Sequence, residues 1–378
     1  MKKNVIYKMC IIFFFLINLT IFGCGYNEPI KIGFVASLTG KTSELGISER
    51  AGAMLAVSNI NDSGGINGRR IELIVKDDQN DAAIAIKVDQ ELIDAGVVAI
   101  IGHATSTMTK AALPLINKNK ILMISPTTST TDLSGIDDFL VRIPPLSDAE
   151  MSALAELAQN RHIQKMAVIY DLSNKSLTEN NLKIFRHNYE KGPHKIVSST
   201  PFKSGHDVSF LPIVKKAVAK KPAGIFLLAG SIDTATLCQQ IRKLDKELPI
   251  LILGWATTDD LIKHGGNAVE LIHYVHTIDM NSSAPAFKQF STDLKSKFSI
   301  KPDFGSIYAY QAVYMLYDAI RNSSTLDATA FKNYILKRKT FQGVQADYGI
   351  DEFGDSKGNF IPFTIRNGQF VKESVQNK

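Results

Sequence analysis

The chain has 378 residues, of which 45% are hydrophobic, and this is enough for two ordinary domains with packed cores. Its formal net charge at pH 7 is +6, and basic and acidic residues are interspersed along the sequence. This distribution excludes the clustered basic face on which nucleic-acid binding depends, so no nucleic-acid partner is expected.

The first 23 residues are predicted to be a signal peptide. Three lysines form a basic start, and the uncharged run MCIIFFFLINLTIFG has the length of a secretory apolar region rather than of a membrane span. The run ends in Gly-Cys, which resembles a bacterial lipobox and predicts that Cys24 carries a lipid anchor, with residues 24–29 as the anchored linker. Because Phe22 is bulky where a lipobox has a small residue, an uncleaved N-terminal anchor is the alternative. Both place the rest of the chain in a periplasmic or other extracytoplasmic location.

The cysteines agree with this processing. Cys10 lies in the signal peptide and Cys24 is the predicted lipid site, which leaves Cys238 alone. No intramolecular disulfide is then expected, so stability has to come from core packing. Cys238 lies in the helical pattern TATLCQQIRKL and is predicted to be buried rather than reactive.

The loop FVASLTGKTSELG, residues 34–46, contains the letters GKTS that end a phosphate-binding loop. A complete loop of that kind has a first glycine five positions before Gly40, where this chain has Val35. A β-branched residue does not take the backbone geometry that glycine provides there, so the sequence argues against a nucleotide site.

Short apolar runs alternate with amphipathic stretches through the first half, which is the pattern of βαβ units and a parallel sheet. The predicted strands are residues 30–37, 69–78, 97–102 and 121–125, and the predicted helices are residues 47–65, 82–96 and 109–120, the last interrupted or begun near Pro114.

The second half repeats this order. The runs KMAVIYD, HKIVSSTPF, PAGIFLLAGS, LPILILGWAT and IHYVHTI correspond in turn to IKIGFVA, RRIELIVKD, VVAIIGHATS, KILMISPTTS and FLVRIPP. Any α/β chain alternates, but here the Ser/Thr/Gly-rich loops recur after the same strands, which favours two similar parallel-sheet domains.

Ligands of open parallel sheets bind beyond the carboxyl ends of the strands, so two such domains facing each other would enclose a ligand between these loops. Hydroxyls and exposed N–H groups at helix N-termini suit an anion such as a carboxylate, although helix capping is the alternative role of each residue. The loop residues are Ser37, Thr39, Thr105, Ser106, Thr107, Thr127, Thr128, Ser129, Asp171, Ser173, Asn174, Ser231, Asp233, Trp255, Thr257 and Thr258.

From about Ile30 onward the chain resembles the substrate-binding proteins of branched-chain amino-acid ABC transporters. The resemblance rests on IKIGFVASLTGKTSELG, on IIGHATSTMTKAALPLI, on ILMISPTTSTTDL and above all on NINDSGGINGRRIELIVKDDQND. It implies a type I periplasmic-binding fold, in which two Rossmann-like α/β domains are joined by a three-segment hinge.

The implied domains are residues 30–145 with 278–355, and residues 146–277 with 356–378. The hinge segments are then residues 144–146, 277–279 and 355–358. The run DFGSIYAYQAVYMLYDAI is expected to be a long helix of the first domain, and GNFIPFTIRNGQFVK a strand hairpin of the second.

The resemblance also implies ligand-binding residues in the first domain. Leu45 and Gly46 would lie near the ligand, and Ser106 would bind its carboxylate. Thr127 would bind it through the backbone, and Ser129 through the hydroxyl.

In the second domain the implied ligand-binding positions are Lys175, Ser231 and Trp255. The family has an aromatic residue in the loop where this chain has Lys175, and a tyrosine or similar residue near Ser231. The third position is Trp255. The family's acid shortly after this last position is replaced by Ala256 and Thr257, with Asp259 and Asp260 as shifted alternatives. Because a desolvated ammonium needs a carboxylate partner, this predicts a carboxylic acid without a free amine, packed against Trp255 or Tyr308. Tyr310 is a further candidate, with core packing as the alternative role of both tyrosines.

The implied function is that of a receptor for a small carboxylate-bearing solute, which it delivers to the permease subunits of an ABC importer. A sensor of the same fold that signals through a membrane receptor is the alternative. An enzyme, a cofactor and a metal site are not expected, since the G-x-S-x-G, H-E-x-x-H and G-x-G-x-x-G motifs are missing. His273 and His276 lie in a predicted strand on opposite faces, and no acid pair is expected near His103.

Overall fold

The computed structural model describes residues 28–40, 43–205 and 207–373. The predicted signal peptide and the predicted lipid site at Cys24 lie outside these described residues. Within them, no helix combines the length and the apolar character that a membrane crossing needs.

The first sheet has five parallel strands in the order β2-β1-β3-β4-β5. The strands are β1 (Ile30–Ala36), β2 (Ile71–Asp77), β3 (Ala99–Ile101), β4 (Leu122–Ser125) and β5 (Leu140–Arg142), and the helices between them are α2 (Ser43–Asp62), α3 (Ala82–Asp94) and α4 (Ser106–Asn119). Side chains of a strand point alternately to its two faces, and here both faces are buried. Ile32 and Phe34 belong to the core that contains α2, whereas Val35 belongs to the core that contains α3 and α4.

The second sheet has seven strands in the order β15-β14-β10-β9-β8-β6-β7. Its strands are β6 (Lys165–Asp171), β7 (Lys195–Phe202), β8 (Gly224–Leu228), β9 (Ile250–Ile252), β10 (His273–His276), β14 (Ile361–Arg366) and β15 (Gln369–Lys372). Its helices are α5 (Ser147–Asn160), α6 (Lys175–Tyr189), α7 (Phe210–Val218), α8 (Ser231–Leu244) and α9 (Asp259–Gly265). One buried core joins α5 and α6 to the sheet and a second joins α7, α8 and α9 to it, so helices cover both faces.

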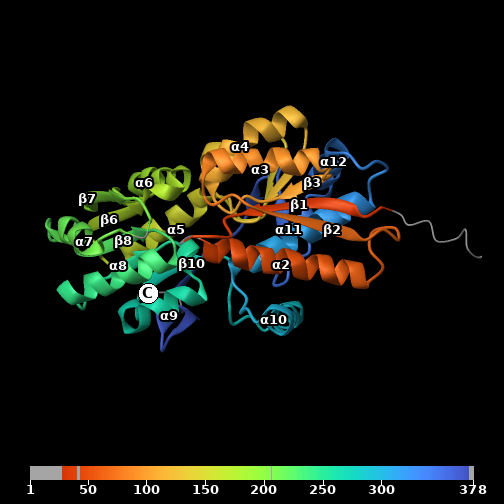
Figure 1. The fold of residues 1–378 in the computed structure, drawn as a ribbon. Helices are drawn as coiled ribbons and strands as arrows, with labels where there is room; N and C mark the ends of the chain where they lie inside the picture. Colours follow the sequence, from red (N-terminus) through yellow and green to blue (C-terminus); the bar gives the residue numbers. More distant parts are fainter. Residues whose placement is uncertain (1–27, 41–42, 206, 374–378) are drawn as a thin grey trace, which may run out of the picture.

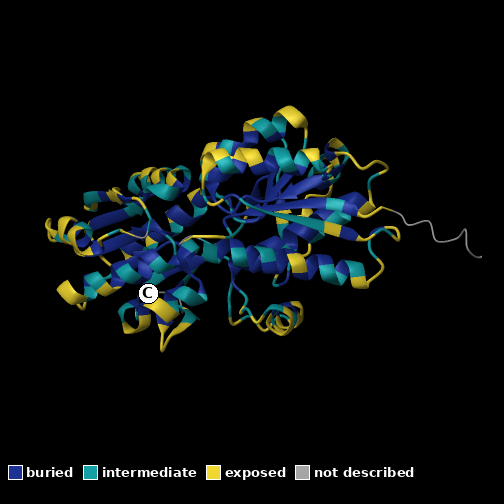
Figure 2. Ribbon diagram, viewed as in Figure 1, coloured by how far each residue is buried: buried dark blue, intermediate teal, exposed yellow. Residues whose placement is uncertain are grey.

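The segment after β10 returns to the first sheet with α10 (Pro285–Phe298), α11 (Phe304–Arg321) and α12 (Ala328–Arg338). A small three-stranded sheet follows, made of β11 (Thr340–Phe341), β12 (Tyr348–Ile350) and β13 (Ser356–Lys357). α11 packs along α2, and the two helices lie close together at Gly52, where a Cβ atom would lie 2.0 Å from the carbonyl oxygen of Ser306. Figure 1 shows the two α/β halves side by side, and Figure 2 shows their strands buried beneath helices with exposed outer faces.

The two sheets share one topology, since β7-β6-β8-β9-β10 repeats the order β2-β1-β3-β4-β5. This confirms the predicted fold class of two similar α/β units. The predicted hairpin is also present, as β14–β15, and it joins the second sheet antiparallel to β10, so that this sheet is mixed. The three short strands β11–β13 were not predicted.

Two predicted helices also differ from the structure. α2 begins at Ser43 rather than at residue 47, so Glu44 and Leu45 lie in its first turn. α4 runs from Ser106 through Pro114 without interruption. The predicted burial of Cys238 in α8 and the strand at residues 273–276 are both confirmed.

The chain passes between the two sheets three times, in the segments 143–146, 277–284 and 358–360. An isolated bridge between Pro145 and Ser356 joins the first passage to β13, directly before the third passage. These passages lie at or beside the three segments proposed as the hinge.

Candidate functional site

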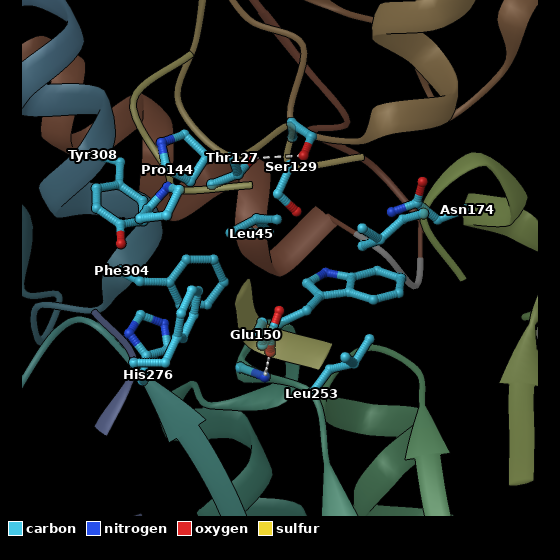
Figure 3. A pocket seen from close by; sticks show the side chains of 16 residues that line it. Leu45, Thr127, Ser129, Pro144, Glu150, Asn174, Leu253, His276, Phe304 and Tyr308 are labelled. Atoms are coloured by element: carbon cyan, nitrogen blue, oxygen red, sulfur yellow. Dashed lines mark hydrogen bonds between the residues drawn. The ribbon is translucent and has the colours of Figure 1, made fainter. Parts of the chain in front are cut away.

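A cavity of about 60 Å³ lies between the two sheets, and we call it the cleft cavity. Figure 3 shows that side chains from both halves surround it. The first half contributes Leu45, Ala104, Thr127, Ser129, Phe304 and Tyr308, the second half contributes Glu150, Asn174, Leu177, Leu253, Gly254, Trp255 and His276, and the passages contribute Pro144, Pro145 and Phe360. Most of these residues follow or end a strand, which places the cavity at the carboxyl edges of both sheets.

Five of the nine predicted ligand-binding residues line the cleft cavity: Leu45, Thr127, Ser129, Trp255 and Tyr308. The hydroxyl of Thr127 lies 2.6 Å from both Oε1 of Glu49 and the carbonyl oxygen of Ala104. It is therefore engaged within the protein, which is compatible with a ligand contact through the backbone. The phenol of Tyr308 lies 2.6 Å from the hydroxyl of Thr277.

Ser106 and Gly46 lie just outside the cavity lining. Ser106 is the first residue of α4, and its buried Oγ has no hydrogen-bond partner within the described residues. A buried hydroxyl without a partner is costly, so this atom is available to a ligand anion. Packing explains why residue 46 is a glycine, because a Cβ atom there would lie 2.1 Å from the carbonyl oxygen of Ser37.

Ser231 and Lys175 lie on other parts of the cleft. Ser231 lines a second cavity, of about 30 Å³, which we call the side pocket and which shares Leu45 and Trp255 with the cleft cavity. Lys175 begins α6 and lines a more open groove of about 490 Å³ between the halves, together with Asn80. The structure does not bring Lys175 to the cleft cavity.

Three further candidates prove to be structural. Tyr310 packs its ring against Phe290 and Tyr314 and does not line the cleft cavity. Asp259 pairs with Lys263 and Lys301, and Asp260 pairs with Lys263, so neither carboxylate faces the cavity. The suggestion that these two acids replace the missing acid after Trp255 is therefore wrong.

Glu150 is a cavity residue that the sequence interpretation missed. It lies in the first turn of α5, and its Oε1 accepts a hydrogen bond of 2.8 Å from the backbone N–H of Gly254. Burial raises the pKa of Glu150 to about 7, although the hydrogen bond from Gly254 opposes the shift. The premise that the cleft lacks an acid is thus contradicted, because a carboxyl group reaches the cavity from another element.

His276 is the second titratable group of the cavity lining. Its Nδ1 lies 2.9 Å from the backbone nitrogen of Ile278, which donates to it, so this ring nitrogen carries no proton. Burial lowers the pKa of His276 to about 4, and the ring is therefore neutral at physiological pH.

Glu44 joins the two halves across the cleft. Its carboxyl oxygens accept hydrogen bonds from the hydroxyls of Ser231 and Thr258, which belong to the second half. Burial raises the pKa of Glu44 to about 7, the two hydroxyl bonds lower it, and the charges of Asp260 and Asp303 raise it further. The helix start predicted at residue 47 left Glu44 in a loop, so this contact was not foreseen.

His103 lies behind the cleft rather than in it. Its ring is fully buried, with Nδ1 at 2.7 Å from Asp78 and Nε2 at 3.1 Å from Asp89. The expectation that no acid pair lies near His103 is therefore wrong. Because both ring nitrogens face carboxylates, this group fixes the loop before Ser106 in place and has no route to a ligand.

Comparisons with known proteins agree with this architecture. Residues 29–359 match the family model described as periplasmic binding protein. A leucine-, isoleucine-, valine-, threonine- and alanine-binding protein of Pseudomonas aeruginosa is 25% identical over 352 residues, which cover 89% of each chain.

Two solved structures share the fold. A leucine binding protein LivK from Thermotoga maritima has a TM-score of 0.83 at 24% identity, and the match covers 91% of this chain and 98% of that one. A solute binding protein of an ABC transporter from Rhodopseudomonas palustris, in complex with 3,4-dihydroxy benzoic acid, has a TM-score of 0.82 at 20% identity, with 91% and 95% covered. The matched family model spans most of the sequence, and the chain therefore belongs to the periplasmic binding protein family, a family of extracytoplasmic substrate-binding proteins.

Proposed function

We propose that this protein is the extracytoplasmic receptor of an ABC importer, which holds a small carboxylate-bearing solute in the cleft cavity and delivers it to a membrane permease. The observation that carries the proposal is the buried hydroxyl of Ser106, which has no partner within the described residues and lies at the N-terminus of α4. A helix N-terminus favours anions, and the loop with Thr127 and Ser129 lines the adjoining cavity.

Two relatives support this solute class. The Pseudomonas aeruginosa protein is named for binding amino acids, and the Rhodopseudomonas palustris structure holds a hydroxylated benzoic acid. Both kinds of ligand carry a carboxylate. We propose further that Cys24 anchors the receptor to the membrane and that the passages near residues 144–146, 277–279 and 355–358 bend when the cleft closes, with domains bounded as the resemblance implies.

A thermal-shift screen of the chain from about residue 25 tests the function directly. We expect amino acids or organic acids to raise the melting temperature, because a ligand that binds only the folded state stabilises it by about 2.7 kcal/mol at a hundredfold excess over Kd. Ser106→Ala is expected to weaken this binding by about tenfold or more through the lost hydrogen bond to the carboxylate.

Ser296→Ala, at an exposed serine of α10, is the matched control and should bind like the wild type. The proposal fails if no carboxylate shifts the melting temperature, or if Ser106→Ala binds as tightly as the control.

Closure of the cleft is expected to depend on pH through Glu44. Its pKa is about 7 in this conformation, whereas opening the cleft exposes the carboxyl group and returns the pKa towards its ordinary value of 4.5. The closed form thus takes up a proton, so Glu44 favours closure most below pH 4.5, and the contribution is lost as the pH rises through about 7.

We therefore expect wild-type ligand affinity, measured by titration calorimetry between about pH 5 and pH 8, to fall with rising pH more steeply than that of Glu44→Gln. Glutamine keeps the two hydroxyl contacts but does not titrate. Glu179→Gln, at an exposed position of α6, should keep the wild-type slope. Equal slopes for the wild type and Glu44→Gln would show that Glu44 does not control closure.

A further inference from the structure

Acidic and basic side chains are unequally represented in the lining of the cleft cavity. Among the described residues that line it, Glu150 has the one carboxyl group, and no lysine or arginine side chain is present. The imidazole of His276 does not compensate, because its Nδ1 accepts a hydrogen bond from the backbone N–H of Ile278 and the ring is neutral. A solute with two acidic groups would find no cation here, whereas a solute with a positive group would find an acceptor.

The carboxyl group of Glu150 is held in place, and in the part of the chain that the structure describes only one of its two oxygens accepts a hydrogen bond. Its Oε1 accepts the hydrogen bond from Gly254, and within the described residues Oε2 makes no hydrogen bond. The backbone of Gly254 holds it closely, since a Cβ atom at that position would lie 3.2 Å from Oε1 and 2.8 Å from the ring of His276. The group therefore offers an acceptor to the cavity without needing to move.

Glu44, the other carboxyl group at the cleft, is not equivalent. Both of its oxygens accept hydrogen bonds, from Ser231 and from Thr258, and it lines the side pocket instead of the cleft cavity. Of the two, Glu150 is the one with acceptor capacity directed at a solute.

The polar groups proposed for the carboxylate lie on the opposite wall of the cavity. Figure 3 shows Thr127 and Ser129 on one side of Leu45, and Glu150 and His276 on the other. We propose that Glu150 selects a solute with a protonated amine, so that an amino acid bridges the cleft with its carboxylate on the first half and its ammonium on Glu150. This rests on the proposed function, and it replaces the expectation of an amine-free acid.

The arrangement explains why the cavity tolerates a buried acid at all. A solute with a carboxylate and no amine would bring a second negative charge beside Glu150, which would have to be protonated for binding. An ammonium group removes that conflict, because it donates to Oε2 and neutralises the buried carboxylate. The apolar side chains of Leu45, Leu253 and Phe304 would then contact the remainder of the solute.

The test compares each standard amino acid with its amine-free counterpart, for example L-leucine with isocaproate and L-alanine with propionate. Affinities are measured by titration calorimetry at about pH 8, where a carboxyl group with a pKa of about 7 is ionised. The wild type should bind at least one amino acid about 30-fold or more tightly than its counterpart, as expected for a hydrogen bond between charged groups.

Glu150→Gln is the informative variant, because the amide oxygen preserves the hydrogen bond from Gly254 and hence the local fold. It should lose about 30-fold in amino-acid affinity, while the affinity for the amine-free counterpart stays unchanged or rises. Glu156→Gln, at an exposed position of the same helix, is the matched control and should behave as the wild type.

The outcomes separate this inference from the proposed function. If amine-free acids bind as tightly as amino acids, or if Glu150→Gln affects both classes equally, the role of Glu150 is refuted while the carboxylate receptor stands. If the wild type binds amine-free acids but no amino acid, and Ser106→Ala abolishes that binding, the role of Glu150 is likewise refuted and the carboxylate receptor stands. If neither class binds the wild type, the proposed function and this inference both fail.

Discussion

Replacing Arg142 with methionine is expected to lower the free energy of unfolding by about 3–5 kcal/mol, the usual loss when one partner of a buried ion pair is removed. Arg142 is fully buried in β5, and its Nε lies 2.9 Å from Oδ1 of Asp355, which Nη2 also contacts. Methionine fills a similar volume, so the loss would come from the carboxylate that is left buried without its cation. Urea denaturation followed by circular dichroism measures it.

The double variant Arg142→Met with Asp355→Leu provides the control. Removing both charges should recover a substantial part of the lost free energy of unfolding, because no buried carboxylate is then left without its cation. A loss below about 1 kcal/mol in the single variant would mean that water or a neighbouring group satisfies Asp355.

This pair also connects stability to the site. Nη1 of Arg142 donates a hydrogen bond of 2.5 Å to the carbonyl oxygen of Thr130, the residue after Ser129. Asp355 accepts a hydrogen bond of 3.0 Å from the backbone of Gly135 and immediately precedes β13. The same ion pair therefore holds the loop with Ser129 against the segment that leads to the third passage, and the methionine variant should also bind ligand more weakly.

The fold could be predicted because its strands are buried on both faces. Runs such as IKIGFVA are apolar almost throughout, and the polar loop residues recur after the same strands in both halves. The sheet β11–β13 gave no such signal, since two of its strands have two residues each and cannot show a period.

Some cavity residues are positioned by the strand directly before them, and others by contacts with residues far away in the sequence. Thr127 and Ser129 follow a strand directly, so the strand end determines where they lie and a local pattern is sufficient to find them. Glu150 follows Ser147 with the Ser-x-x-Glu spacing of a helix cap, yet no side-chain capping bond forms and its partner is Gly254, more than a hundred residues away. No local pattern contains that pairing, and the same holds for the contacts of Glu44 with Ser231 and Thr258.

His103→Gln is expected to destabilise the protein by about 3–5 kcal/mol, because it leaves two buried carboxylates without their cation. Both ring nitrogens of His103 lie within hydrogen-bond distance of an aspartate, and only the imidazolium can donate from both. Burial alone would lower the pKa of His103, but the charge of Asp89 and the hydrogen bonds to both aspartates outweigh it and raise the pKa to about 10.

The pH dependence of stability distinguishes this charged group from a merely well-packed ring. The pKa of His103 is raised above its ordinary value of 6.5, so its contribution is complete below pH 6.5 and is lost as the pH rises through about 10. In that window folding takes up a proton that the unfolded chain has released. The difference in unfolding free energy between the wild type and His103→Gln should therefore shrink with rising pH, by at most about 1.4 kcal/mol per unit. Taking the difference cancels the other titrating groups that the two proteins share. A difference that stays constant from about pH 6 to pH 9 would mean that the buried histidine carries no charge.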